Sequence, residues 1–144
     1  MTTWSGRDGP QADSPFSATL ILGGQVRGGE PRLFLIYPEG NFIEAKADTP
    51  FFQIGEHKYG KPILDRVVGP DTGLADAQKA VLLSMDSTLR SNLSVGMPLD
   101  LAVIAKDDCR ISSQRRIEAG DSDFAQMSEA WSTALRDSFT QIQL

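Results

Sequence analysis

Residues 74–106 read LADAQKAVLLSMDSTLRSNLSVGMPLDLAVIAK and contain one helical pattern, one polar segment and one strand pattern. In the helical pattern, apolar side chains recur every three or four positions, which predicts one apolar helix face. That face holds Leu74, Ala77, Val81, Leu82, Met85 and Leu89. The opposite face holds Asp76, Lys79 and Ser84. We therefore expect an amphipathic helix whose polar side meets solvent.

The polar segment at residues 86–92, DSTLRSN, predicts the end of this helix. Short polar side chains such as these compete with the helix for backbone hydrogen-bonding groups. Asp86, Ser91 and Ser94 are expected to converge here, at the edge of a packed layer. We place the candidate functional site at this segment.

The strand pattern at residues 99–105, LDLAVIA, is short and almost continuously apolar. A run of this kind is typical of a strand that is covered on both faces of its sheet. The sequence therefore predicts a buried strand after the polar segment.

Upstream of residue 74 the sequence predicts an arm, four strands and a helix. Residues 1–15 are polar and rich in Gly and Pro, which favours a flexible N-terminal arm; the folded domain then covers residues 16–144. Apolar and β-branched runs between Gly- and Pro-rich turns predict the strands. They are expected at residues 17–24, 32–37, 41–47 and 51–55, and the first two should form an antiparallel hairpin. A helix is expected within residues 56–68, started late or kinked by Pro62.

Downstream of residue 105 the sequence predicts strand structure and a last helix. Residues 109–119 predict one strand or a strand pair. Acidic residues at 120–123 favour a helix N-terminus, because they lie at the positive end of the helix dipole. A stripe with helical spacing follows: Phe124, Met127, Trp131, Leu135 and Phe139, with Ile142 beyond. We interpret this stripe as core or subunit interface.

The predicted order groups the strands in hairpins and the helices together, which favours an α+β fold over alternating βαβ units. Two consecutive helices would cover one face of a mainly antiparallel sheet. The chain is short of elements to cover the other face.

The composition bounds the class of protein. The length of 144 residues fits one domain, and the single cysteine, Cys109, allows no internal disulfide and favours a reducing compartment. No apolar run approaches the roughly 20 residues of a membrane helix, and no signal pattern opens the chain, so we expect a cytoplasmic protein. A net charge of −5 argues against a nucleic-acid surface.

No pattern points to a cofactor or a metal ion, because one His and one Cys cannot form a His/Cys metal site. His57 lies in a polar context and is interpreted as a surface or capping residue rather than part of a catalytic triad. Removal of Met1 would expose Thr2, whose amine could serve as its own general base. Because Thr2 lies in the predicted arm and not at a strand end, we interpret it as idle.

Several segments together resemble one family. LFLIYPEG at residues 33–40, followed by FQIG at 52–55, is similar to the second half of a proteasome-type β subunit. Residues 84–101, with residues 37–44 and 55–66, resemble the bacterial branch called Anbu, the ancestral β subunit. The resemblance covers about residues 16–139.

The resemblance implies an N-terminal-nucleophile hydrolase with a four-layer αββα sandwich, assembled into rings or ring-like homo-oligomers. Such enzymes cleave polypeptides with an N-terminal threonine, helped by an Asp and a Lys from the first half of the domain. Asp86 and Ser91 resemble the supporting Asp and Ser that follow the second outer helix. Glu56 takes the place of a supporting serine.

Nothing in the chain resembles the family's opening strands. We therefore expect the C-terminal portion of a threonine peptidase subunit, inactive unless the other half is supplied. The alternative is a non-catalytic scaffold that self-assembles.

Overall fold

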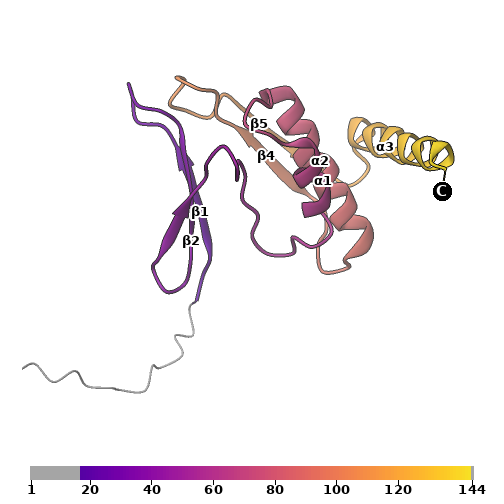
Figure 1. Ribbon diagram of the computed structural model, residues 1–144, viewed down its shortest axis with the longest axis horizontal. Helices are drawn as coiled ribbons and strands as arrows, with labels where there is room; N and C mark the ends of the chain where they lie inside the picture. Colours follow the sequence, from indigo (N-terminus) through magenta and orange to yellow (C-terminus); the bar gives the residue numbers. More distant parts are fainter. Residues whose placement is uncertain (1–16, 144) are drawn as a thin grey trace, which may run out of the picture.

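The computed structural model describes residues 17–143 (Figure 1). The elements follow in chain order as β1 (Leu20–Gly24), β2 (Arg32–Ile36), β3 (Phe42–Glu44), α1 (Lys61–Val67), α2 (Leu74–Ser91), β4 (Leu99–Val103), β5 (Ser113–Ile117) and α3 (Ser122–Gln141). The predicted arm at residues 1–15, including Thr2, lies outside the described residues. None of the described helices has the length and apolar character that a membrane crossing needs.

Strands β1, β2 and β3 form an antiparallel sheet in that order. The β1–β2 hairpin pairs Leu20 with Ile36 and Gly24 with Arg32, which confirms the predicted hairpin. Its turn contains Gly28 at φ 81°, a conformation that a residue without Cβ adopts at little cost. Strand β3 is shorter than the expected 41–47, because the chain turns at Lys46 and Thr49 before Pro50.

The fourth strand expected at residues 51–55 is absent from the described chain, where this segment is a loop. The aromatic side chains of this segment are half-buried, whereas its backbone takes no part in a sheet. Phe51 is half-buried, and its ring centre lies 5.9 Å from the ammonium group of Lys61 in α1. Gly55, at φ 72°, then turns the chain out of an extended conformation. The apolar, β-forming residues of this segment predicted a strand, but it pairs with no strand in the part of the chain that the structure describes.

Helix α1 begins late, with Pro62 in its first turn, as expected. It packs closely on α2 through Gly60, its N-cap residue. A Cβ atom at Gly60 would lie 2.9 Å from the carbonyl oxygen of Ser84 and 3.1 Å from Oγ1 of Thr88. Real Cβ atoms do not come so close to a backbone oxygen, so the α1–α2 contact requires glycine here.

Helix α2 continues to Ser91, so it ends inside the predicted segment at residues 86–92, at the last residues of that segment. The short polar side chains that predicted a break form hydrogen bonds inside the fold. Thr88 Oγ1 donates to the Ser84 carbonyl at 2.9 Å, and Asp86 is bound by side chains described below. The helix ends at Asn92, whose N–H donates to the Thr88 carbonyl.

The predicted apolar face of α2 is also not the face that is most buried. Leu74 and Val81 are 50% and 39% exposed, whereas Ser84, expected on the polar side, is 2% exposed. The buried positions are Ala80, Leu83, Ser84, Asp86 and Thr88. Both α1 and α3 contact α2, and the small side chains at these contacts override the hydrophobic pattern.

Strands β4 and β5 form a separate antiparallel pair. Leu99 pairs with Ile117, and both are buried. The rest of β4 alternates, with Asp100 and Ala102 exposed, so the prediction of a strand covered on both faces is wrong for the described chain. Residues 109–119 contribute one strand, β5, and not a pair.

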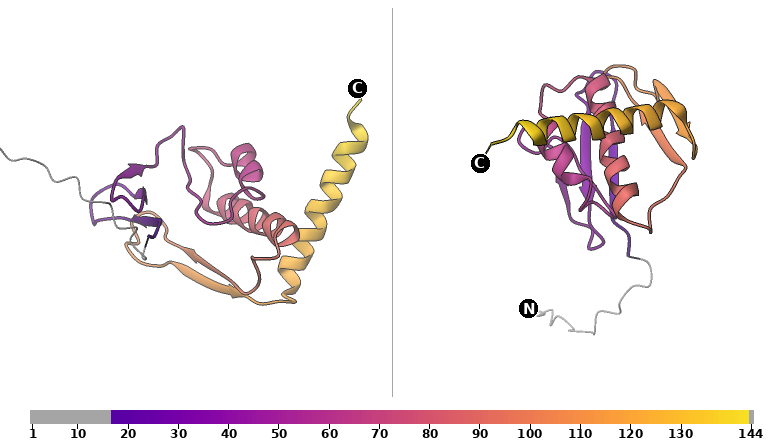
Figure 2. Two further views of the ribbon diagram at one scale, coloured as in Figure 1. Left: turned by 90° about the horizontal axis from the view of Figure 1, so that it is seen from below. Right: turned by 90° about the vertical axis from the view of Figure 1, so that its right-hand side faces the viewer.

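Helix α3 begins where the acidic residues predicted. The Asp121 carboxylate caps it by accepting from the Phe124 N–H at 2.9 Å. Figure 2 shows α3 crossing the end of α2 and extending away from the rest of the molecule.

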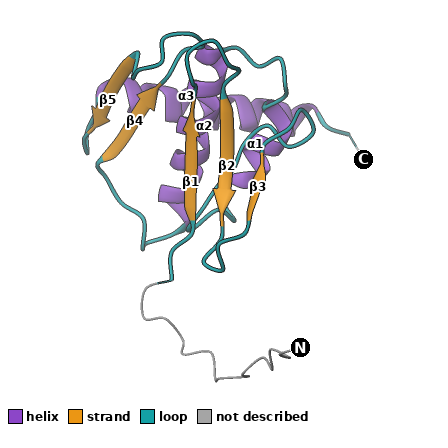
Figure 3. Cartoon of the chain, turned by 90° about the vertical axis from the view of Figure 1, so that its left-hand side faces the viewer, coloured by secondary structure: helices purple, strands orange, loops and turns teal. Residues whose placement is uncertain are grey.

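In Figure 3 the helices lie behind the strands of both sheets. Apolar side chains of the larger sheet, such as Leu20, Leu22 and Phe42, are more than half exposed, which agrees with the expected shortage of covering elements. The predicted α+β class is confirmed.

Candidate functional site

Asp86 lies on the face of α2 that meets α3, and it is 5% exposed. Its Oδ1 accepts a hydrogen bond of 2.7 Å from the Ser128 hydroxyl of α3. The Arg90 guanidinium, one turn further along α2, donates through Nε to Oδ1 at 3.4 Å and to Oδ2 at 3.3 Å. A buried carboxylate therefore has both a hydrogen-bond donor and a positive charge beside it, which is what its burial requires.

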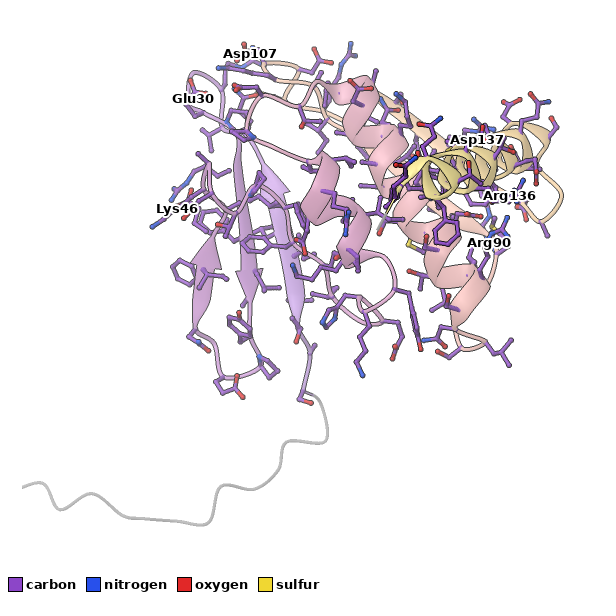
Figure 4. The ribbon with its side chains drawn as sticks, turned by 45° about the vertical axis from the view of Figure 1, so that its right-hand side comes forward. Glu30, Lys46, Arg90, Asp107, Arg136 and Asp137 are labelled. Carbon is purple, nitrogen blue, oxygen red and sulfur yellow. The ribbon has the colours of Figure 1, made fainter. Side chains whose placement is uncertain are left out.

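Arg90 and Ser128 also contact each other. Arg90 Nη2 donates to the Ser128 hydroxyl oxygen at 2.7 Å, so that this hydroxyl accepts from Arg90 while it donates to Asp86. Arg90 is labelled beside α3 in Figure 4. Ser132 Oγ donates to the Ser128 carbonyl at 2.9 Å. We call Asp86, Arg90 and Ser128 the docking triad, because its bonds join α2 to α3.

Ser91 and Ser94 lie elsewhere. Ser91 is the exposed last residue of α2. Five helical positions separate it from Asp86, so the two side chains point about 140° apart around the axis. Ser94 binds Asn92 Oδ1 through its backbone N–H at 2.9 Å and through its hydroxyl at 2.7 Å. The expected convergence of the three residues does not occur in the described chain. The supporting roles of Asp86 and Ser91 in catalysis stay predictions.

Sequence reasoning missed Arg90 and Ser128, although the sequence holds a signal for each. Asp86 and Arg90 have the i, i+4 spacing at which opposite charges meet on a helix. Ser128 lies between Phe124 and Trp131 on the apolar stripe of α3, where a serine is out of place. A polar residue on each of two helices suggests that they bind each other. The apolar stripes of α2 and α3, taken separately, do not show that these two helices face each other.

Two further sets of polar contacts join elements near the sheets. Arg32 and Glu44 form a bidentate ion pair of 2.6 and 2.9 Å between β2 and β3, and the hydrogen bond from Arg32 lowers the pKa of Glu44. At the hairpin tips, Gln25 donates to Asp107 Oδ1 at 2.8 Å and accepts from the Asp107 N–H at 2.6 Å. This pair of bonds joins the β1–β2 turn to the loop after β4.

A cavity of about 630 Å³ lies between the end of the β1–β2 hairpin and β4. Gly23, Gly24, Arg32, Lys46 and Ala102 are among its lining residues. Arg32 is already neutralised by Glu44, and the lining brings no nucleophile together with a base. Glu56 and His57, the other positions considered in the sequence, are exposed, and His57 Nδ1 lies 3.0 Å from the Gly55 carbonyl.

The chain was then compared with known proteins. The sequence model of the family described as "Proteasome subunit" matches residues 11–104, well over half of the chain. The chain belongs to the proteasome subunit family. No curated protein sequence matched it significantly.

Solved structures place it closer to one branch. It is 61% identical to an Anbu (Gly-1) mutant from Hyphomicrobium sp. strain MC1, over 86% of this chain and 54% of that chain, with a TM-score of 0.83. It is 51% identical to Anbu from Yersinia bercovieri, over 90% of this chain and 55% of that one, with a TM-score of 0.85. A structure described as the helical assembly of the Anbu complex from Pseudomonas aeruginosa is 47% identical over 92% of this chain and 55% of that chain, with a TM-score of 0.84.

These comparisons confirm the resemblance to Anbu and the proteasome-like α+β fold. The chain spans slightly more than half the length of the relatives that it matches. The activity, substrates and partners of a whole subunit are therefore matters for proposal.

Proposed function

We propose that this chain is part of an Anbu-type subunit that self-assembles and hydrolyses peptide bonds with an N-terminal threonine. The observation that carries the proposal is the 61% identity to an Anbu structure over 86% of the chain. At that identity, backbone and site geometry are expected to be shared. Polypeptides are the proposed substrates.

In this proposal Asp86 and Ser91 are supporting residues: they help to position the threonine and form no bond to the substrate. Ser91 is the more accessible of the two, because it is exposed at the end of α2. Its hydroxyl could hydrogen-bond the threonine amine, whereas Asp86 already accepts from Ser128 and Arg90. Asp86 would then act by holding α2 and α3 in place.

The test is the hydrolysis of fluorogenic peptides by the native protein, after its N-terminal residue has been sequenced. We expect turnover that is lost when an N-terminal threonine is changed to Ala. Ser91→Ala should lower kcat by about 10²-fold, the lower end of the range that acid–base groups contribute. Ser138→Ala, an exposed serine on α3, is the matched control and should leave kcat unchanged. Absence of turnover on a broad peptide library would contradict the proposal.

Residues 1–144 expressed alone are expected to be inactive, because the resemblance assigns the nucleophile, its Asp and its Lys to a half of the domain that nothing in this chain resembles. The same assay on this chain and on its Thr2→Ala variant is the check. Turnover that disappears with Thr2→Ala would show that Thr2 is a nucleophile.

A non-catalytic, self-assembling scaffold is the second candidate. It is favoured by the bonds of Asp86, which hold two helices together, and by the description of the Pseudomonas relative as a helical assembly. Light scattering and the peptide assay on the native protein distinguish the candidates. A large, defined oligomer without activity supports the scaffold, whereas a monomer counts against it.

A further inference from the structure

Arg90 stands directly before Ser91, the residue whose hydroxyl is proposed to bind the threonine amine. Its guanidinium reaches across to α3, where Nη2 donates to the Ser128 hydroxyl at 2.7 Å (Figure 4). Its Nε donates to the two carboxylate oxygens of Asp86 at 3.4 and 3.3 Å. One side chain therefore connects the last turn of α2 both to the turn before it and to a second helix.

The end of α2 has few other restraints in the described chain. Its C-cap residue, Asn92, has an extended backbone, and Leu93 stands at the position where many helices have a glycine that ends them. Leu93 is fully exposed and packs on nothing that the structure describes. Among the hydrogen bonds that residues 88–92 form in the described chain, only the bond from Arg90 to Ser128 reaches another helix or strand.

The charge of Arg90 acts on the same turn. Arg90 is the basic residue of the last turn of α2, where a positive charge interacts favourably with the helix dipole. The last turn of a helix has carbonyl groups without helical partners and is therefore prone to fray. The guanidinium thus stabilises this turn as a helix and also holds it against α3.

Ser91 takes its place from this turn. Neighbouring residues of a helix point about 100° apart, so the Ser91 side chain leaves the helix in a different direction from Arg90 and is exposed. The location of its hydroxyl follows from the location of the turn. A displacement of about 1 Å at a site that positions reactants can cost about 10²-fold in rate.

We propose that Arg90 is a positioning residue for the hydrolysis reaction. By binding Asp86 and Ser128 together it fixes the last turn of α2, and with it the Ser91 hydroxyl beside the threonine amine. This inference rests on the proposed function. It gives Arg90 no contact with the substrate, and it gives Ser128 of α3 the same indirect role, exerted through Arg90.

The experiment measures kcat and KM of the native protein and of its Arg90→Met, Ser91→Ala and double variants. Methionine keeps the unbranched stem of the side chain and removes the guanidinium. Arg90→Met should lower kcat about tenfold and leave KM unchanged, because the turn is displaced but not lost. Added to Ser91→Ala, it should lower kcat by less than about twofold, because residues that act through one another are not additive.

The double variant separates positioning from a merely structural role. A general loss of folded protein would lower kcat by the same factor with and without the Ser91 hydroxyl, and that result would overturn the proposal. A raised KM with an unchanged kcat would show that Arg90 binds the substrate itself, and would overturn it as well.

Arg136→Met is the matched control. Arg136 is an exposed arginine of α3 that donates to Glu129 and Thr133 (Figure 4). Its side chain is 64% exposed, close to the 57% of Arg90. This variant should keep the wild-type kcat. An equal loss in the two arginine variants would overturn the proposal.

Two milder substitutions test the bridge to α3. Ser128→Ala should lower kcat less than Arg90→Met does, because Arg90 keeps its bonds to Asp86. Ser132→Ala, whose hydroxyl binds a carbonyl inside α3, should leave kcat unchanged. Arg90→Lys should recover only part of the activity, because a single ammonium group keeps the charge but lacks the separate donors that reach both partners. Full recovery by lysine would show that charge alone matters.

Hydrogen exchange on the native protein measures the restraint without an assay of activity. In Arg90→Met the amides of Ser91 and Asn92 should exchange about tenfold faster, because the last turn opens locally. The amide of Leu83, in the middle of α2, should exchange at the wild-type rate. Unchanged exchange at Ser91 and Asn92 would overturn the proposal.

The outcomes also separate this inference from the proposed function. A wild-type protein that cleaves peptides, with an Arg90→Met variant of equal kcat, overturns the positioning role and leaves the proposed function standing. A wild-type protein without turnover on any peptide overturns the proposed function, and the positioning role with it.

Discussion

The two contacts that α2 makes with other helices differ in kind. At α1, Gly60 lets backbone and small hydroxyls approach closely beside Ser84 and Thr88, and the contact is steric. At α3, Asp86, Arg90 and Ser128 form charge-assisted hydrogen bonds, and the contact is polar. The steric contact tolerates no added atom. The polar contact depends on several hydrogen bonds, and a single substitution removes only some of them.

The largest effect is expected from Gly60→Ala, because the new Cβ would press on the Ser84 carbonyl and on Thr88 Oγ1. We expect a loss of about 1 to 3 kcal/mol in the free energy of unfolding, the usual cost of overpacking. Urea unfolding followed by circular dichroism is the measurement. Gly69→Ala is the control, since a Cβ there meets nothing within 4 Å. Equal stability of the two variants would mean that the α1–α2 contact is not steric.

A similar effect is expected from Asp86→Ala. It leaves the Ser128 hydroxyl without its acceptor and Arg90 without its counter-charge. Hydrogen bonds to charged groups contribute about 1.5 to 3 kcal/mol, so unfolding should become easier by about that amount. Ser91→Ala, at an exposed position on the same helix, should stay within about 0.5 kcal/mol of the wild type. A stable Asp86→Ala protein would remove the case for a docking role.

Ser128→Ala should cost less, about 1 kcal/mol, because Arg90 remains to balance the Asp86 charge. The double variant with Asp86→Ala sharpens the comparison. If the docking triad is one network, the two losses should fall short of additivity by about 0.5 kcal/mol or more. Additive losses would show that Ser128 and Asp86 act separately. Gly60→Ala, in contrast, should add fully to Ser128→Ala.

The smallest effect is expected from pH at the start of α3. The hydrogen bond from the Phe124 N–H, and then Arg115, lower the pKa of Asp121. A carboxylate with a lowered pKa in the folded state stabilises that state above the pKa of the unfolded chain. This contribution is lost as pH falls through the folded pKa. The helical signal of α3 should therefore weaken below about pH 4, and less so in Asp121→Asn, which keeps a capping oxygen without the titration.

Hydrogen exchange of the α3 amides as a function of pH measures this directly. The groups beside Gly60 at the α1–α2 contact are the Ser84 carbonyl and the hydroxyls of Ser84 and Thr88, which do not titrate, so the amides there should respond less in this range. A response of equal size at both contacts would contradict the assignment to Asp121.

Local signals in the sequence were sufficient for several elements. The Gly-rich turn at residues 28–29 predicted the β1–β2 hairpin, because a turn that needs a positive φ selects glycine. Pro62 predicted the start of α1, and Asp121 predicted the start of α3. These signals act within a few residues of each other, so the sequence carries them completely.

The strand expected at residues 51–55 and the expected convergence of Asp86, Ser91 and Ser94 were wrong for a shared reason. Both patterns describe what a segment would do if its side chains had only local partners. Phe51 instead packs beside Lys61, and Asp86 binds Ser128 at a distance of 42 positions in the sequence. Long-range partners of this kind leave no periodic pattern to read.

The sequence by itself therefore determined the α+β class, the hairpins, the helix starts and the membership of the proteasome family. The class, the hairpins and the helix starts follow from turn chemistry and capping, whose physical causes are local, and the family membership follows from segments that resemble known subunits. The tertiary structure alone decided which face of α2 is buried, that Asp86 serves the contact with α3, and that half of α3 is left uncovered. Burial depends on which elements lie against each other, and only the folded chain determines that arrangement.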